Sequence, residues 1–244
     1  MLSDLRPLSS INCYNKYADD AGLLSPENTD VDIVLEFDNL KSWSVRNKLP
    51  INFSKTKEIV FHRPSPRLLV LPSPITNIER VFLTKLLGVT ITDDFRFNSH
   101  INSIITVCNQ RLYLLKSLKS SNLSTSSLHI IFNTLIISSI LHALPAWGGF
   151  VTAHDITPLD SILSKSYKFG YSTKRYCFTT LLNESDGSFF KNICSQNHCI
   201  NHLLPQLKPL AYNSRPRGHS YALPQINFTL FKKSFINRAL LNFV

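Results

Sequence analysis

Hydrophobic positions recur at two different spacings along the chain, and each spacing predicts a different kind of element. Ile33, Phe37, Leu40 and Trp43 lie three or four residues apart, which predicts one face of a helix over residues 30–48, ending before Pro50. The polar residues between them are expected to face solvent: Asp32, Glu36, Asp38 and Lys41.

Shorter apolar runs bounded by polar turns predict strands before residue 92. They lie at 12–17, 21–24, 51–53, 58–61 and 83–91. The last run contains Gly88 and is expected to form a pair of strands. Four prolines between Arg63 and Ile75 predict a connecting segment.

Helical spacing dominates from residue 93 onward. An apolar stripe over 101–118 predicts a long helix, with Arg111, Lys116 and Lys119 off that stripe. The stripe consists of Ile101, Ile104, Ile105, Cys108, Leu112, Leu115 and Leu118. Ser124 is expected to cap the next helix. The apolar run from residue 128 to 145 includes two histidines and an asparagine, so we interpret it as a buried helix and not as a membrane span, which needs about 20 mostly apolar residues.

The C-terminal part of the chain is less regular. Helices are predicted over 156–169, within 178–199 and over 229–241. The second is expected to be interrupted near Ser185-Asp186-Gly187. The segment from Pro205 to Gly218 is expected to be extended and basic.

Charge divides the chain unevenly. The 244 residues carry a net charge of +10, and 43% of them are hydrophobic, enough for a core. Residues 1–94 hold 12 acidic and 11 basic residues, whereas residues 95–244 hold 4 acidic and 15 basic ones, a net charge of +11. Such a bias favours a polyanionic partner, with nucleic acid as the usual one. An anionic membrane face and a merely solvated basic surface are the alternatives.

Several classes of protein lack support in the sequence. Neither of the common glycine-rich phosphate loops occurs. The five cysteines form no regular framework, and Met1 is followed by Asp4 and Arg6 instead of an apolar signal sequence. We therefore expect reduced thiols and an intracellular protein, in the nucleus or the cytoplasm and not secreted.

Candidate chemistry lies in Tyr17-Ala18-Asp19-Asp20, between the first two predicted strands. We expect a hairpin with the two aspartates as its turn. Two adjacent carboxylates repel each other unless a cation neutralises them, and their hard oxygens suit Mg²⁺, with Mn²⁺ as an alternative. Paired metal ions of this kind support phosphoryl transfer. An ordinary aspartate-rich turn remains the alternative interpretation.

Two other groups of potential metal ligands are weaker candidates for a metal site. Asp93-Asp94 is expected to be a simple turn. Two cysteines and two histidines lie within residues 194–202, but structural zinc sites usually pair two ligand clusters separated by a longer loop. The zinc hypothesis concerns Cys194, His198, Cys199 and His202, and no zinc is expected there.

The segment around Asp19 and Asp20 resembles the polymerase-centre motif of reverse transcriptases, specifically those of non-LTR (LINE-type) retrotransposons. Further segments resemble the same family in the same order along nearly the whole chain. They are Leu40-Lys41-Ser42-Trp43, Asn47 to Asn52, Lys55 to Glu58, Leu86 to Val89, Phe97 with His100-Ile101, Pro145 to Gly148, Arg215 to His219 with Leu223-Pro224, and Lys233 to Ile236.

The resemblance implies an α+β fold. Residues 1–92 would be a partial palm with the catalytic hairpin, 93–150 a mainly helical thumb-like region, and 151–244 a basic C-terminal region. The family extends a DNA primer on an RNA template with deoxynucleotide triphosphates. No membrane partner is expected.

The family's site residues map onto this chain by motif. Asp19 and Asp20 would bind Mg²⁺, and Lys55 and Lys57 would lie near the triphosphate. Primer and template would meet Tyr17, Leu87 and Gly88, and the thumb residues Arg111, Lys116 and Lys119.

The family's third metal-binding carboxylate, on an earlier strand, has no counterpart among the eighteen residues before Asp19, where Asp4 is the sole acid. The family's fingers have no counterpart either, so we expect this chain to be inactive alone. A non-catalytic nucleic-acid-binding remnant, a host-recruited interaction protein and a pseudogene product remain alternatives, as does a truncated gene model.

Overall fold

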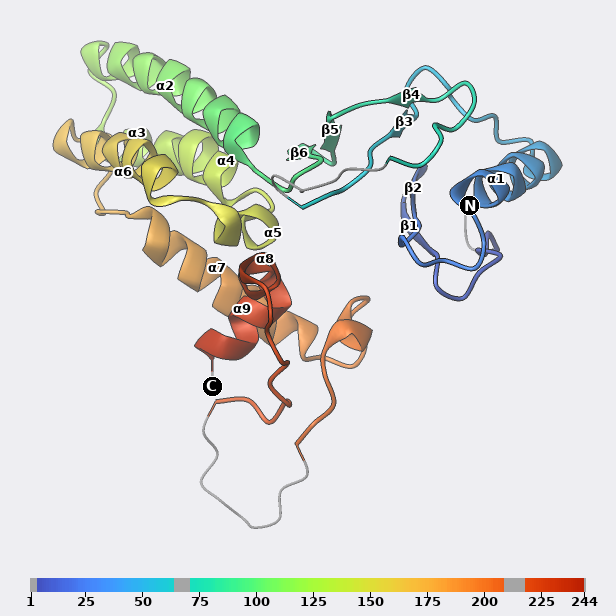
Figure 1. Ribbon diagram of the computed structural model, residues 1–244. Helices are drawn as coiled ribbons and strands as arrows, with labels where there is room; N and C mark the ends of the chain where they lie inside the picture. Colours follow the sequence, from blue (N-terminus) through green and yellow to red (C-terminus); the bar gives the residue numbers. More distant parts are fainter. Residues whose placement is uncertain (1–3, 64–70, 209–217, 244) are drawn as a thin grey trace. The chain divides into compact units, whose positions relative to one another are not determined.

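The chain folds into two compact units, Met1–Thr84 and Lys85–Val244 (Figure 1). The computed structural model describes residues 4–63, 71–208 and 218–243. Helices make up 49% and strands 11% of the chain, and the described strands all precede residue 93. This separation of strands from most of the helices is an α+β arrangement.

The first unit begins with a hairpin of β1 (Cys13–Tyr17) and β2 (Asp20–Leu24). The strands are antiparallel, and Tyr17 pairs with Asp20. The predicted hairpin is therefore confirmed, but its two loop residues are Ala18 and Asp19, and Asp20 already belongs to β2. The turn lies one residue earlier than expected because this register gives Asp20 a partner across the ladder.

Helix α1 (Ile33–Asn47) follows the hairpin, as the apolar spacing predicts. Phe37 packs with Ile75 and Ile78 in a small core against which Ile33 and Leu40 also pack. Lys48, in the left-handed conformation, ends the helix, and its amide donates to the carbonyl oxygens of Ser44 and Val45. The predicted end before Pro50 is confirmed.

Glu36 contradicts the expectation of a solvated face, because its side chain is fully buried. Its carboxylate accepts hydrogen bonds from the amides of Leu8 and Ser9, each at 2.9 Å, and from Asn12 Nδ2 at 2.9 Å. Glu36 thus holds the segment before β1 against α1. A helical spacing alone cannot reveal this, since the donors come from 24 to 28 residues earlier in the chain.

The remaining strands are short. β3 (Lys57–Glu58) pairs in parallel with β4 (Glu79–Arg80), and β5 (Leu83–Leu86) pairs with β6 (Val89–Thr92). The strand predicted at 51–53 is wrong, because the amides of Lys55 and Thr56 bond back to the Asn52 carbonyl and turn the chain. The strand predicted at 58–61 shrinks to β3. Most of the predicted connector at 63–75 lies outside the described residues.

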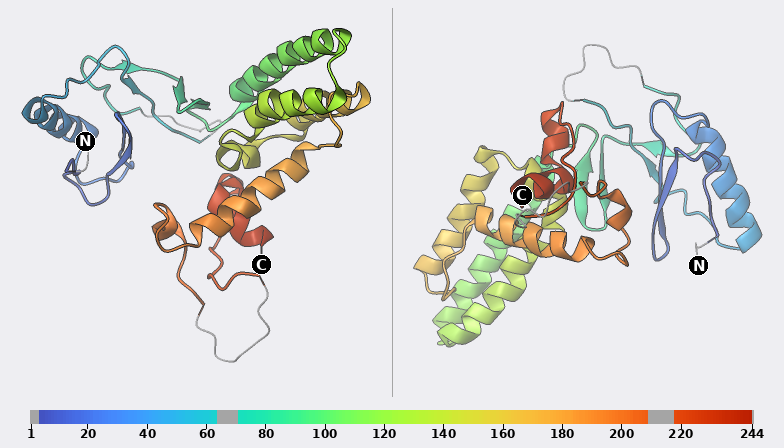
Figure 2. Two further views of the ribbon diagram at one scale, coloured as in Figure 1. Left: turned by 180° about the vertical axis from the view of Figure 1, so that it is seen from behind. Right: turned by 90° about the horizontal axis from the view of Figure 1, so that it is seen from below.

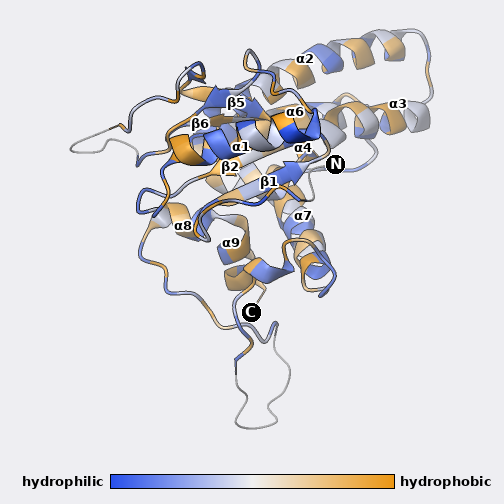
Figure 3. Cartoon of the chain, turned by 90° about the vertical axis from the view of Figure 1, so that its right-hand side faces the viewer, coloured by the Kyte–Doolittle hydropathy of each residue, from blue (hydrophilic) through white to orange (hydrophobic). Residues whose placement is uncertain are grey.

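The second unit is helical. Its first helix is α2 (Asn98–Ser120), which confirms the predicted stripe: Ile101, Ile104, Cys108 and Leu115 are buried. Both hydrophilic and hydrophobic residues lie along α2 in Figure 3. The next helical stretch consists of α3 (Thr125–Phe132), a π-helical turn (Asn133–Ile137), α4 (Ser138–Leu141) and α5 (Leu144–Trp147). The Ser124 hydroxyl accepts the Ser127 amide at 3.2 Å, so the predicted cap is confirmed.

This apolar stretch supplies the centre of the core. Leu128, Phe132, Ile136, Leu144 and Trp147 are almost completely buried. By length and composition alone, Thr125–Phe150 is apolar enough to cross a membrane, with a mean hydropathy of 1.6.

The unit continues with α6 (Ala153–Lys168) and α7 (Phe178–Ile193) and ends with α8 (Thr229–Lys233) and α9 (Phe235–Asn242). Both views in Figure 2 show α7 running beside the two last helices. The predicted interruption near Asp186 is wrong, because α7 is continuous there. The single helix predicted over 229–241 is divided at Ser234.

The division into units differs from the predicted boundaries at residues 92 and 150. The principal core joins Ile101 and Leu115 on α2 to Leu159 on α6 and Phe178 on α7. Residues before and after position 150 therefore share one core.

Candidate catalytic hairpin and nucleic-acid interface

The aspartate pair lies at the exposed tip of the β1–β2 hairpin. Tyr17, Ala18, Asp19 and Asp20 are all exposed, and Tyr17 retains 66% of its accessible surface. Within the described parts of the chain, neither aspartate side chain takes part in a hydrogen bond or an ion pair. Ala18 has a φ of 53°, in the left-handed region that favours glycine, so an alanine there carries backbone strain at the tip.

The two carboxylates at the hairpin tip could supply part of the ligands of a magnesium site. Mg²⁺ is usually held by one or two carboxylates, with water and substrate phosphates completing its shell. Asp19 and Asp20 supply two exposed carboxylates that have no partner among residues 4–63, 71–208 and 218–243. The described residues contain no group of three or more His, Cys, Asp or Glu side chains arranged around a metal. The chain thus offers two carboxylate ligands and no complete metal cage within those residues.

Asp4 is engaged elsewhere. Its carboxylate accepts a hydrogen bond from Trp43 Nε1 at 3.0 Å. That bond lowers the pKa of Asp4 below its usual value. Asp4 therefore joins the N-terminal segment to α1.

The two candidate lysines differ in their surroundings. Lys57, in β3, forms an ion pair with Glu79 of β4. Lys55 is exposed, and it is the backbone amide of this residue that bonds to Asn52. Of the two side chains, Lys55 is the one left available for a phosphate.

Leu87 and Gly88 form the two-residue loop between β5 and β6, with φ angles of 46° and 89°. His142 Nε2 lies 3.1 Å from the Leu87 carbonyl oxygen. A side-chain carbon at Gly88 would lie 2.8 Å from the same nitrogen. The absence of a side chain at Gly88 thus allows the close approach of the His142 ring. Contact between Gly88 and a primer end stays a prediction.

His100 lies against β6, and the sequence assigned it no role beyond the family motif that contains it. Its ring is 5% exposed, Nδ1 accepts the Thr90 amide at 3.4 Å, and its Nε2 has no hydrogen-bond partner among the described residues. Burial, followed by the nearby His142 and Lys85, lowers the pKa of His100. The ring meets Trp147 edge-on, with centroids 5.2 Å apart. His100 is thus a neutral core residue joining β6 to α5.

The three basic residues predicted to contact primer and template differ in their hydrogen-bond partners. Arg111 Nη1 donates to the Leu135 carbonyl oxygen and the Ser139 hydroxyl, which fastens α2 to the π-helical turn. Lys119 Nζ donates to the Phe169 carbonyl oxygen at 2.5 Å. Lys116 is exposed. Only Lys116 of the three is left without an internal role.

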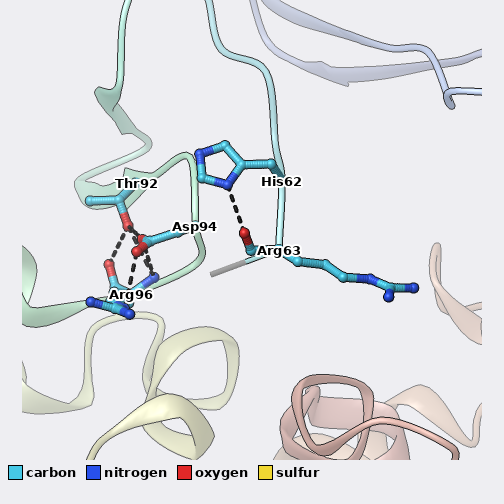
Figure 4. Close-up of polar contacts among 5 residues, drawn as sticks. All are labelled: His62, Arg63, Thr92, Asp94 and Arg96. Atoms are coloured by element: carbon cyan, nitrogen blue, oxygen red, sulfur yellow. Dashed lines mark hydrogen bonds and ion pairs between the residues drawn. The ribbon is translucent and has the colours of Figure 1, made fainter. Parts of the chain in front are cut away.

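The second aspartate pair forms a turn, as expected. Asp94 accepts hydrogen bonds from the Thr92 hydroxyl at 2.8 Å and the Arg96 amide at 3.1 Å, and forms an ion pair with Arg96 (Figure 4). Burial alone would raise the pKa of Asp94, but these bonds outweigh it and lower the pKa. This carboxylate is satisfied within its own loop.

The segment considered for zinc does not form one helix. Helix α7 ends at Ile193, and the chain continues through turns to a 3₁₀ turn over Asn201–Leu203. His198 and His202 therefore do not share a helical face. Cys194 borders the small core around Phe190.

Described residues from three of the segments that carry the family resemblance bond to α9. Arg238 donates to the Pro145 carbonyl oxygen at 3.0 Å and the Lys233 carbonyl oxygen at 2.6 Å, and pairs with the fully buried Asp186 at 2.7 and 2.8 Å. His219 Nε2 lies 2.7 Å from the Leu240 carbonyl oxygen. These contacts therefore hold α9 against α7 and the Pro145 segment, a role that the sequence did not predict for Arg238.

Compared with protein-family models, with curated proteins and with solved structures, the chain matches none of them.

Proposed function

We propose that this chain is the hairpin-and-thumb part of a LINE-type RNA-directed DNA polymerase, which extends a DNA primer on an RNA template. The observation that carries the proposal is the β1–β2 hairpin, which exposes Asp19 and Asp20 beside an exposed Tyr17, with neither carboxylate bonded to another of the described residues. By contrast, the carboxylates of Asp4, Glu36, Asp94 and Asp186 accept hydrogen bonds from groups within the protein. The hairpin tip therefore presents two carboxylates that could bind a metal ion.

The residues of the hairpin tip and Lys55 would have different roles in polymerisation. Asp19 and Asp20 would bind Mg²⁺, which when bound neutralises charge on transferring phosphates. The Tyr17 ring would contact the primer–template, and Lys55 would lie near the triphosphate. The strained φ of Ala18 supports a functional tip, because left-handed non-glycine residues persist where the surrounding structure imposes them.

A second function, non-catalytic nucleic-acid binding, is favoured by a separate observation. Residues 95–244 carry a net charge of +11 and fold as part of one helical unit. Nucleic-acid binding by this unit requires neither aspartate. Nucleic-acid binding would therefore persist in a chain whose hairpin no longer supports catalysis.

Manganese binding to the intact chain tests the hairpin directly. Mn²⁺ should broaden the NMR amide signals of residues 17–21 selectively. Asp19→Asn together with Asp20→Asn should abolish this broadening, whereas Glu27→Gln, an exposed carboxylate of the same unit, should preserve it. Broadening that survives in the aspartate variant, or none at the tip in the unaltered chain, would refute the hairpin as a metal-binding tip.

A further inference from the structure

A basic surface with exposed aromatic rings lies at the C-terminal end of α6 and the loop that follows. Tyr167 and Phe169 retain 47% and 49% of their accessible surface. Four cations of the same segment are exposed as well: Lys165, Lys168, Lys174 and Arg175. We call these six residues the α6 platform. Figure 1 shows the C-terminal ends of α2 and α6 at the same end of the helical unit.

The backbone of the α6 platform is fixed by a helix-ending motif. The Gly170 amide donates to the Tyr167 carbonyl oxygen at 3.0 Å, and the Tyr171 amide donates to the Ser166 carbonyl oxygen at 2.9 Å. This pair of bonds, with Gly170 at a φ of 69°, is the Schellman arrangement. Lys119 Nζ adds a bond to the Phe169 carbonyl and lies 5.9 Å from the centroid of the buried Tyr171 ring. The two exposed rings therefore project from an ordered backbone.

The charge of the α6 platform is of one sign. Between Ser161 and Asn183 the chain has no acidic residue and four basic ones. The guanidinium carbon of Arg175 lies 5.9 Å from the centroid of the Tyr167 ring. The nearest acid along the helix, Asp160, accepts the Phe178 amide at 2.7 Å. The surroundings thus favour an anion, and the exposed rings favour a flat aromatic ligand.

Lysines in the last turn of a helix also stabilise its C-terminus through the helix dipole. That role accounts for Lys165 and Lys168 but not for two large rings left exposed beside them. Exposed rings within a cationic groove are the combination on which single-stranded nucleic acids bind, with phosphates on the cations and bases stacked on the rings.

We propose that the α6 platform binds single-stranded nucleic acid by stacking unpaired bases on Tyr167 and Phe169. This inference rests on the proposed nucleic-acid binding by the helical unit and names its site and its preferred ligand. It is independent of the polymerase hairpin, since it requires no metal, no aspartate and no primer end. In a duplex the base faces are covered by stacking, so a duplex can use only the cations of this surface. Single strands should therefore bind more tightly than duplexes.

Fluorescence anisotropy of the full chain with a labelled twelve-nucleotide polyuridine tests the proposal. Tyr167→Ala with Phe169→Ala should weaken binding about ten-fold or more. The double variant Tyr167→Phe with Phe169→Tyr should retain binding, because an aromatic ring remains at each position. Replacing Lys168 and Lys174 by glutamine should lower the salt slope by about 0.7 for each phosphate that the protein no longer neutralises.

Phe231→Ala is the matched control. Phe231 is also 49% exposed, and it precedes Lys232 and Lys233 on α8. Its loss should leave binding unchanged. Thermal unfolding followed by circular dichroism establishes that each variant is folded.

Three outcomes would overturn the proposal. They are a folded double-alanine variant that binds like the unaltered chain, a duplex that binds as tightly as the single strand, and a preference for anionic phosphatidylserine vesicles. Asp19→Asn with Asp20→Asn should bind polyuridine normally. The α6 platform and the polymerase hairpin can thus fail independently.

Discussion

At the scale of single residues, the structure separates polar side chains that hold the fold together from those left to meet a ligand. Glu36, Asp186 and Arg111 each satisfy backbone or side-chain groups within the protein. Asp19 and Asp20 do not. Sequence spacing predicted the exposed aspartates but wrongly placed Glu36 in solvent, because its partners lie in a distant segment that no local pattern reveals.

Glu36 should make the stability of the first unit depend on pH. Burial alone would raise its pKa, but the hydrogen bonds from Asn12, Ser9 and Leu8 outweigh it and lower the pKa in the folded chain. Its stabilisation is therefore complete above about pH 4.3, the ordinary value for glutamate, and is lost as the pH falls through the lowered folded-state pKa.

Urea unfolding between pH 3 and 7, followed by the amide NMR signals of α1, measures this effect. Glu36→Ala should cost about 3 kcal/mol at pH 7, because it leaves buried donors unsatisfied. Glu36→Gln should lose much of the pH dependence in the acid range. Asp38→Asn, on the exposed part of α1, serves as the control. A Glu36→Gln chain with an unaltered acid transition would contradict this assignment.

At the scale of elements, local patterns predicted which segments are helical and where several of them begin and end. The α2 stripe, the Ser124 cap and the end of α1 before Pro50 were all predictable from neighbouring residues. The continuity of α7 was not. Asp186 is stabilised within α7 by Arg238, which lies 52 residues later, and the Gly187 position is packed closely by Phe243.

Arg238 should therefore be among the most sensitive positions of the second unit. Arg238→Ala leaves Asp186 as an unpaired buried charge and removes donors to two carbonyl oxygens, which should cost about 3–5 kcal/mol of unfolding free energy. Chemical denaturation followed by circular dichroism measures the loss.

Lys232→Ala, an exposed cation one helix earlier, should change stability by less than about 0.5 kcal/mol. Asp186→Asn combined with Arg238→Ala should recover part of the lost stability, because it removes the unpaired charge. An Arg238→Ala chain as stable as Lys232→Ala would show that the pair does not hold α7 to α9.

At the scale of the whole molecule, the sequence predicted an α+β chain whose basic part is helical. It placed boundaries at residues 92 and 150, and it could not reveal the core that joins α2 to α6 and α7, because this core depends on contacts across tens of residues. It also could not assign roles to the thumb cations. Arg111 and Lys119 donate hydrogen bonds to carbonyl oxygens elsewhere in the helical unit, whereas Lys116 and the α6 platform lie exposed.

The central claim is that the β1–β2 hairpin is a polymerase hairpin, and primer extension by a chimera tests it most directly. The fingers and first catalytic strand of a LINE-type reverse transcriptase would be fused in front of this chain, which supplies the hairpin, the thumb and the C-terminal region. Extension of a DNA primer on an RNA template would be measured with Mg²⁺ and with Mn²⁺.

The account predicts extension by the chimera, no extension by the 244-residue chain alone, loss of extension in the Asp19→Asn and Asp20→Asn chimeras, and full extension in the Glu27→Gln chimera. Two results would contradict it: a folded chimera that extends no primer under either metal, or extension that persists without the two aspartates.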